Sequence, residues 1–473
     1  MTYIHDLQKL SVVHGGPIER VLLYQKPLWF SDCMLAVSKS SKALGVAKFM
    51  RSRMDASQAD NELPLDVLGG AASLGAGLAF DAQEAMIKAL CEGVERYCGQ
   101  IVDPKRHIFV TSSYDEMVSK GFDLPYWQDL SWKGDGHAPS MGVKKYNELT
   151  PFNRQASIRW LQVKKLPEMS LAYVPVVQCF LGIEFASVYE RICEQMSTGM
   201  ACGSSWIGAA SSGIYEVIER DAIMGMWLTR RSPPRVLLKS LMHYTKRQSL
   251  KKICSEFLQT GYEIIISDLT NDVGVPVFFV TLLYNAPPFT IVGASCGIDA
   301  DYVLEKALVE VLMGLSSDAI YKGLSLDSRE APSPAGEGAI RTMSGHAEFY
   351  AKNDCRERMA FLCAGKEIDY ADSLAVRASL SMSSEASVLG EIGLLAKKLA
   401  QVGKTAYIND LTCDFASELS LHVVKAVVPG LLPLYNRESN KPEKMARLRD
   451  YATIYERKLD FGEEVNPWSH PFP

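Results

Sequence analysis

Two stretches of the sequence carry the same charged motif. ALCEGVERYCGQ occupies residues 89–100, GIYEVIERDAIM occupies residues 213–224, and each contains Glu-x-x-Glu-Arg. Residues at positions i, i+3 and i+4 share one face of a helix, so the two glutamates and the arginine of each motif would project together. The repetition predicts two related helices that do the same chemical work.

The repetition extends upstream of both motifs. In each copy a serine and a glycine stand 19 and 17 residues before the first glutamate. The matching residues are Ser73, Gly75 and Glu92 in the first copy and Ser197, Gly199 and Glu216 in the second. In a third, weaker copy, Gly293 stands 17 residues before Glu310. A glycine-rich turn followed by a helix with an inward carboxylate is therefore a recurring unit.

The charged motifs allow two interpretations. Glu/Arg pairs are common on solvated helices, where they contribute little to stability. Here, however, Ala-Leu-Cys precedes the first motif and Gly-Ile-Tyr the second, and solvated helices are rarely so apolar beside their charges. Buried carboxylates must be paired or hold metal, and Mg²⁺ meets proteins through a few carboxylates plus substrate phosphates. Because glycine lets the backbone approach a ligand closely, the pattern predicts a nucleotide-phosphate site.

The composition excludes several other classes of function. The 473 residues are 47% hydrophobic and 22% charged, with a formal charge of -5, so we expect a folded protein that binds neither nucleic acid nor membrane. The start lacks a secretory signal pattern, which favours a cytoplasmic location. The eleven cysteines contain no C-x-x-C pair and are expected to be reduced. No Walker-type loop or G-x-S-x-G elbow is present.

Strands that alternate with long helices predict a layered α/β (α+β) fold. Three strands are expected within 262–299, a helix over 300–320, and a helix followed by a strand over 385–412. The segment 325–342 is the most loop-like internal stretch. We divide the chain into an N-terminal extension (1–65), a central domain (66–437), and a C-terminal helix with a proline-containing tail (438–473).

Four ordered segments carry a family resemblance. They are SLGAGLAFDAQEAMIKALCEGVERY, STGMACGSSWIGAASSGIYEVIERDA, SDLTNDVGVPVFFV and GASCGIDADYVLEKALVEVL. In order and spacing they resemble the YcaO family of ATP-dependent peptide-modifying enzymes. The resemblance implies a fold in which helices from internally related halves hold ATP and Mg²⁺ with glutamates. In azoline-forming members a Cys, Ser or Thr side chain of a ribosomal precursor peptide attacks the preceding amide, whose oxygen takes the γ-phosphoryl group of ATP.

The resemblance also implies roles for individual residues. The expected metal ligands, which also belong to the nucleotide site, are Glu92, Glu95, Glu216, Glu219 and Glu310. Arg96 and Arg220 would contact phosphate or orient these carboxylates. Ser73, Ser197 and Lys306 would line the nucleotide site. The resemblance further implies a separate leader-peptide-binding partner, a flavin-dependent azoline dehydrogenase acting afterwards, and a homodimer.

The chain departs from the family pattern at several positions. Residues that many members carry are replaced at Ala76, Thr198, Ser204, Gly208 and Met313, and Lys306 stands where an arginine is common. Arginine and lysine are not equivalent where a planar fork is needed. Two alternatives therefore stay open beside the cyclodehydratase: a non-catalytic scaffold that binds precursor peptide or a partner, and a thioamide-forming enzyme.

The chain ends in NPWSHPFP. Azoline-forming relatives typically end in a proline-rich tail that reaches the active site, so Pro471 and Pro473 join Arg220 as expected catalytic residues. Because proline restricts the backbone, such a tail enters a cleft at a low cost in entropy. We expect the tail to be ordered and buried near Glu92 and Glu219, with Trp468 and Phe472 anchored on apolar surface.

Overall fold

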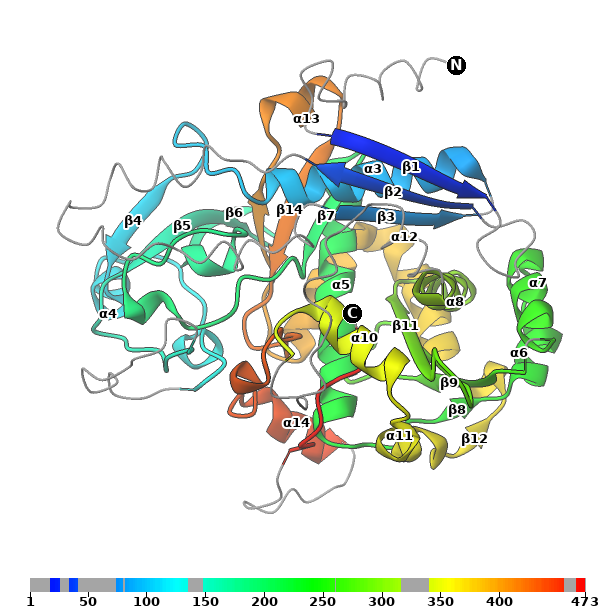
Figure 1. The fold of residues 1–473 in the computed structure, drawn as a ribbon. Coiled ribbons are helices and arrows are strands. Elements are labelled where there is room, and N and C mark those ends of the chain that lie inside the picture. Colours follow the sequence, from blue (N-terminus) through cyan, green and yellow to red (C-terminus); the bar gives the residue numbers. More distant parts are fainter. Residues whose placement is uncertain are drawn as a thin grey trace. The chain divides into compact units, whose positions relative to one another are not determined.

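The computed structural model confirms a layered arrangement of helices and sheets (Figure 1). It describes residues 18–25, 34–40, 74–79, 81–134, 148–259, 261–315, 340–454 and 465–472. Ser73, Pro473 and most of the expected loop at 325–342 lie outside these residues. The chain forms two units: residues 1–26, 32–214 and 405–429 make unit 1, and residues 27–31, 215–404 and 430–473 make unit 2.

Unit 1 contains two sheets. The first is antiparallel in the order β1-β2-β3, built from Ile18–Gln25, Met34–Ser40 and Leu74–Ala79. The second has the order β4-β5-β13-β14-β7, with β6 paired to β5. Its strands are Phe109–Ser112, Ile158–Lys165, Tyr407–Asp410, His422–Val427, Met200–Gly203 and Ser170–Pro175. A domain boundary at residue 65 would therefore divide the first sheet.

Helix α3 (Ala82–Cys98) packs on β2 and β3. It begins at Asp81, whose carboxylate accepts a hydrogen bond from the Glu84 backbone N–H, and its last turn carries Arg96. Both features stabilise a helix, since they satisfy an amide at the start and place positive charge at the end. Unit 1 also contains α4 (Tyr114–Ser119) and α13 (Asp414–Glu418).

Unit 2 is built on a five-stranded sheet. Its order is β11-β10-β9-β8-β12, and its strands are Thr290–Cys296, Val277–Leu283, Glu263–Asp268, Arg235–Val236 and Glu367–Ile368. Every residue of β10 is buried, because β9 and β11 flank it and α8 (Ala300–Leu315) packs on β10 and β11. The three strands expected within 262–299 are thus confirmed.

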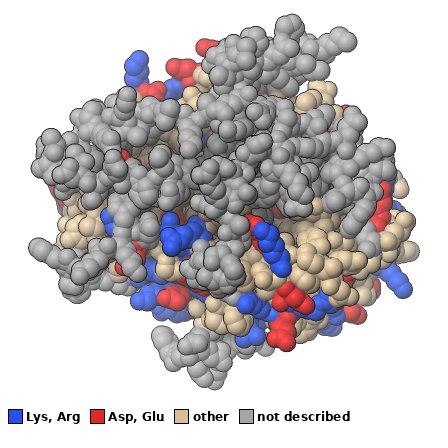
Figure 2. Space-filling model, viewed as in Figure 1, with Lys and Arg blue, Asp and Glu red and all other residues tan. Residues whose placement is uncertain are grey.

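The remaining helices of unit 2 lie around this sheet in the chain order α6, α7, α10, α11, α12 and α14. Their bounds are Leu238–Tyr244, Gln248–Phe257, Met343–Lys352, Arg356–Cys363, Leu374–Gln401 and Arg447–Ile454. Helix α5 (Trp206–Leu228) begins in unit 1 and continues through unit 2. No helix in the described ranges is long and apolar enough to cross a bilayer. Acidic and basic side chains are interspersed among the coloured residues of Figure 2.

A buried ion network joins α5 to α14 within unit 2. Arg447, 1% exposed, donates hydrogen bonds of 2.6–3.2 Å to Asp221 of α5 and to Asp272. Asp221 is fully buried and also accepts from the Tyr451 hydroxyl at 2.9 Å and from the Asn271 amide at 3.2 Å. Burial of a charge is costly unless it is paired and hydrogen-bonded, and here both conditions are met. The network therefore fixes the part of α5 that directly follows Arg220.

Replacing Arg447 by methionine should destabilise the protein strongly. The substitution leaves the Asp221 carboxylate buried without its cation, and breaking a buried pair in this way costs about 3–5 kcal/mol. Urea unfolding followed by circular dichroism measures the change. The exposed neighbour Arg449→Met is the matched control and should change the unfolding free energy by less than about 0.5 kcal/mol. Equal effects of the two substitutions would show that the network does not stabilise unit 2.

Candidate nucleotide and metal site

Unit 2 brings the second and third copies of the repeat together. Helix α5 carries Glu216, Glu219 and Arg220, and α8 carries Glu310. The Arg220 guanidinium lies 3.1 Å from a Glu216 carboxylate oxygen and 3.0 Å from a Glu219 oxygen. The Glu219 side chain is 9% exposed and that of Arg220 is 13% exposed. The surface-pair interpretation is therefore wrong for this helix, because the motif is largely buried.

The carboxylates of this cluster outnumber their cations. Burial raises the pKa of Glu219 to about 8; the Arg220 charge opposes the shift, and the nearby Glu310 carboxylate adds to it. Burial likewise raises the pKa of Glu310, again against Arg220. Lys306 is the other cation that acts on both carboxylates, and its side chain is exposed. A bound cation would replace the proton that burial favours on Glu219, so the cluster suits a cation.

Unit 1 holds the first copy of the repeat. Glu92 of α3 accepts a hydrogen bond from the Arg96 guanidinium at 3.0 Å, and Glu95 lies 3.5 Å from the same group. The other Glu92 oxygen accepts from the backbone N–H of Ala76 in β3 at 2.9 Å. Glu310 accepts from the backbone N–H of Ala294 in β11 at 3.0 Å in the same way. In both hydrogen bonds donor and acceptor are 16 residues apart, so the repeat seen in the sequence is a repeat of atomic contacts.

Gly293 of the repeat, and Gly77 and Gly213 beside it in the sequence copies, lie where a helix packs closely against backbone. A Cβ atom added at Gly293 would lie 2.5 Å from the carbonyl oxygen of Ala307 in α8, and one at Gly77 would lie 2.2 Å from that of Ala85 in α3. A Cβ at Gly213 of α5 would meet the carbonyl oxygen of Gly199 at 2.4 Å. These distances are shorter than any van der Waals contact, so the glycines are needed where a helix packs directly against backbone. The expectation that the repeated glycines Gly75, Gly199 and Gly293 approach a ligand stays a prediction.

The five glutamates expected to bind metal are divided between the units, since Glu92 and Glu95 belong to unit 1. Within the described residues, no three His, Cys, Asp or Glu side chains are arranged to hold a metal ion by themselves. Mg²⁺ does not require such a set, because it commonly takes one or two carboxylates together with substrate phosphates and waters. The surplus carboxylates in unit 2 fit that requirement. Arg220 fits a phosphate, since its buried Nε makes no hydrogen bond in the described structure, while Nη1 pairs with Glu219 at 3.0 Å.

The C-terminal tail is ordered and buried beside this cluster, as expected. Phe472 is 2% exposed, and the Arg220 guanidinium lies 4.3 Å from the centre of its ring. The ring also packs near Phe279 of β10. Pro471 is buried with it. Phe472 therefore covers Arg220 from one side, and the part of the expectation that concerns Glu92 stays a prediction.

Two stacked histidines hold the tail in place. The rings of His470 in the tail and His346 in α10 are parallel within 15°, with centroids 4.0 Å apart, and both side chains are fully buried. Their Nε2 atoms face the carbonyl oxygens of Tyr435 and Asn436 at 3.0 Å. Burial lowers the pKa of His346 to about 4 and that of His470 well below its usual value. Both rings are therefore neutral at physiological pH and stack without repulsion.

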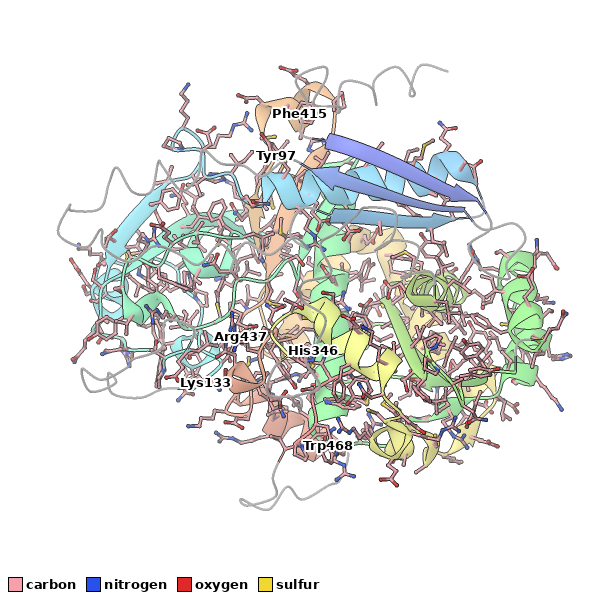
Figure 3. The ribbon with its side chains drawn as sticks, in the orientation of Figure 1. Tyr97, Lys133, His346, Phe415, Arg437 and Trp468 are labelled. Carbon is pink, nitrogen blue, oxygen red and sulfur yellow. The ribbon has the colours of Figure 1, made fainter. Side chains whose placement is uncertain are left out.

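Trp468 of the tail is 38% exposed and lies under the Arg358 guanidinium, which is 4.2 Å from the ring centre. Figure 3 labels this residue together with His346. Phe472 is the buried aromatic anchor of the tail, and an apolar anchor for Trp468 stays a prediction. Sequence reasoning missed both His346 and Arg358, because each lies more than 100 residues from its partner in the tail.

Ser197 and Lys306, also expected near the nucleotide, are placed individually. Ser197 is half-buried just before β7 in unit 1, and its carbonyl oxygen accepts from Met200 at 2.8 Å. Lys306 is exposed on α8, and its ammonium lies 6.0 Å from the ring centre of Tyr302. Their assignment to the nucleotide site remains a prediction.

Residues 76–432 match the family model described as YcaO cyclodehydratase, ATP and Mg²⁺ binding. The chain belongs to the YcaO family. Its family is described as one of cyclodehydratases, with ATP and Mg²⁺ as cofactors, as the sequence indicated.

Solved structures share the YcaO fold with this chain. A heterocyclase in complex with substrate and cofactor matches at a TM-score of 0.68 and 17% identity, covering 100% of this chain and 57% of the heterocyclase. YcaO from Methanopyrus kandleri, bound with AMPPCP and Mg²⁺, matches at 0.52 and 15%, covering 91% and 90% of the two chains. The Escherichia coli microcin synthetase McbBCD complex with pro-MccB17 bound matches at 0.58 and 12%, covering 95% and 96%. This YcaO protein therefore spans little more than half the length of the heterocyclase.

Replacing Glu219 by glutamine should stabilise the ligand-free protein at high pH but weaken its binding of Mg·ATP. A carboxyl whose pKa is raised in the folded state contributes stability that is complete below its unfolded pKa of about 4.5 and is lost as the pH rises through about 8. Glu219→Gln has no charge to bury, so above pH 8 the ligand-free variant should be more stable than the wild type by at least about 1 kcal/mol, roughly one pKa unit. Urea unfolding at a series of pH values measures this difference.

The same variant should lose Mg·ATP affinity by at least about tenfold in calorimetry, because one carboxylate of the cluster is neutralised. Glu305→Gln is the control, since this residue of α8 pairs with Arg247 at 2.6 Å and not with the cluster. Unchanged nucleotide affinity in Glu219→Gln would remove this carboxylate from the site.

Proposed function

We propose that this YcaO protein is an ATP-dependent cyclodehydratase that converts Cys, Ser or Thr of a ribosomal precursor peptide to thiazoline or oxazoline. The surplus of buried carboxylates around Arg220 supports the proposal most directly. Such an arrangement costs stability without a ligand and suits a site for Mg²⁺ and phosphate. Membership of the YcaO family supports the same proposal, and so do the similar folds of the heterocyclase and of the microcin synthetase.

Bound Mg·ATP would supply the phosphoryl group that turns the peptide amide oxygen into a leaving group. Phosphoryl transfer needs positioning and charge stabilisation more than it needs a protein nucleophile. Carboxylates drawn from Glu216, Glu219 and Glu310 would hold the metal together with phosphate oxygens and water. The guanidinium of Arg220 would donate to phosphate oxygens through Nε, which makes no hydrogen bond in the described structure.

The C-terminal tail would help to orient the guanidinium of Arg220. Phe472 lies against one face of the Arg220 guanidinium and keeps water from that face, so its donors are directed along the plane. The stacked pair of His346 and His470 holds the backbone that carries Phe472. Pro471 and Pro473 would limit the freedom of this segment and so maintain its approach to the reacting peptide.

The proposal includes partners. The McbBCD complex is an assembly of several components with pro-MccB17 bound, and we propose that this protein likewise modifies its peptide together with a separate leader-binding protein. A flavin-dependent dehydrogenase would then oxidise azoline to azole, and the protein would act in the cytoplasm as a homodimer. These elements rest on the family and not on contacts within this chain.

The decisive experiment combines the chain with Mg·ATP, the partner, and the short Cys-, Ser- and Thr-rich peptide encoded beside its gene. The peptide should lose one water mass per cyclised residue. If its backbone amides carry heavy oxygen, that label should appear in the released phosphate, because the amide oxygen becomes the phosphate oxygen. Mass gained from an added sulfur source without loss of side-chain nucleophiles would instead indicate thioamide formation. Peptide binding with neither change nor phosphate release would indicate a scaffold.

Removing Pro471 to Pro473 should slow cyclisation by at least about tenfold, or about 1.4 kcal/mol in barrier, because Arg220 loses the ring that covers it. Mg·ATP affinity should change less. Phe472→Leu retains an apolar side chain without the cation–π contact and should give an intermediate rate. Single-turnover mass spectrometry measures these rates. Cyclisation at the full-length rate after truncation would assign the tail a purely structural role.

A further inference from the structure

Two thiols of unit 1 lie within contact distance of each other. The Sγ atoms of Cys98 and Cys413 are 3.4 Å apart, although the residues are 315 positions apart in the sequence. Cys98 ends α3, and Cys413 directly precedes α13. Tyr97 and Phe415, neighbours of the two cysteines in the sequence and labelled in Figure 3, both pack against the core of unit 1. A thiol pair at this distance can form a disulfide with little movement of its side chains.

The two thiols differ in access. Cys98 is fully buried in the core of unit 1, whereas Cys413 is half-buried at its edge. A small reagent from solution therefore meets Cys413 first. Arg106 donates to the carbonyl oxygen of Thr412 and to the carboxylate of Asp414, and so holds the backbone on both sides of Cys413. The access and the fixed backbone distinguish Cys413 from an ordinary core cysteine.

The two thiols also differ in acidity. Hydrogen bonding with Cys98 lowers the pKa of Cys413 to about 6. The nearby backbone N–H groups of Phe415 and Ala416 lower this pKa further, although the Cys413 side chain does not cap α13 through a hydrogen bond. The same contact and burial raise the pKa of Cys98 well above its usual value. Thiolates are the nucleophilic form of cysteine, so the accessible member of the pair is the reactive one.

We propose that Cys413 and Cys98 form a dithiol site that reacts with hydroperoxides, with Cys413 as the attacking thiol and Cys98 as the resolving thiol. The Cys413 thiolate attacks one oxygen of the peroxide, the O–O bond breaks, and the products are a sulfenic acid and hydroxide or alkoxide. The Cys98 sulfur then attacks the sulfenic sulfur, the S–S bond forms, and the hydroxyl group leaves with the Cys98 proton as water. A dithiol reductant restores both thiols.

The disulfide would fasten the end of α3 to the turn between β13 and α13. Because cytosolic disulfides are usually transient, catalytic or redox-sensing, a reversible pair is the form expected for a protein kept in reducing conditions. The site does not depend on the nucleotide chemistry proposed above, and its test needs neither ATP nor peptide.

Peroxide treatment of the intact, reduced protein tests the site. After brief exposure to hydrogen peroxide and alkylation of the remaining thiols, peptide mapping should find Cys98 joined to Cys413. In Cys98→Ser the Cys413 sulfenic acid should persist and be trapped by dimedone, because no resolving thiol remains. Cys413→Ser should leave Cys98 unreacted. A disulfide that joins Cys413 to another cysteine would overturn the proposal. So would a disulfide between Cys91 and Cys202, another hydrogen-bonded thiol pair of unit 1, formed in place of the expected one.

Alkylation rates give a second readout that does not depend on peroxide. At about pH 7 iodoacetamide should react with Cys413 at least about tenfold faster than with Cys363, which is also half-buried but whose pKa burial raises. Replacing Cys363 by serine should leave the formation of the Cys98–Cys413 disulfide unchanged. Equal alkylation rates at the two cysteines would refute the assignment of Cys413 as the attacking thiol.

Discussion

The neutralisation of charges buried along α5 is the constraint on which unit 2 depends. Four charged residues, Glu216, Glu219, Arg220 and Asp221, follow one another within six positions of a helix that is otherwise apolar. Asp221 points to Arg447 and is fully compensated by hydrogen bonds. Burial raises the pKa of Glu219 to about 8, and the charge of Arg220 opposes this shift only in part. Adjacent residues of α5 therefore belong to two different clusters: Asp221 to a structural ion network, and Glu219 and Arg220 to a site suited to a ligand.

The neighbouring ion network helps to explain how unit 2 remains stable despite the incompletely paired carboxylates of the site. A cluster of incompletely paired carboxylates raises the free energy of the ligand-free state, and the cost must be offset elsewhere in the same unit. The Arg447 network lies at the next residue of the helix and supplies rigid, satisfied contacts there. The tail adds the Phe472 ring on Arg220 and the stacked histidines. The position of Arg220 is thereby fixed from two sides.

The sequence predicted the parts that repeat and missed the parts that depend on distant contacts. Equal offsets predicted that Glu92 and Glu310 are equivalent, and they make equivalent contacts, because a strand followed by a helix at fixed spacing returns the carboxylate to the same backbone amide, that of Ala76 or Ala294. Three strands of the unit 2 sheet, β9, β10 and β11, followed from their apolar, β-branched runs, whereas the two-residue strands β8 and β12 were missed. The packing contact of Gly293 with α8 was missed, since a glycine needed for helix packing and one needed for a ligand look alike in a sequence.

The contacts of the tail could not be derived in the same way. Nothing in NPWSHPFP indicates that His470 stacks on His346 or that Trp468 lies under Arg358, because these pairings are set by how α10 and α11 pack in unit 2. The aromatic character of Phe472 indicated an anchor, but its partner proved to be a cation of the site itself. The proline-rich ending therefore matters less as a flexible arm than as a rigid support. It places an apolar ring on Arg220, the arginine that pairs with Glu216 and Glu219.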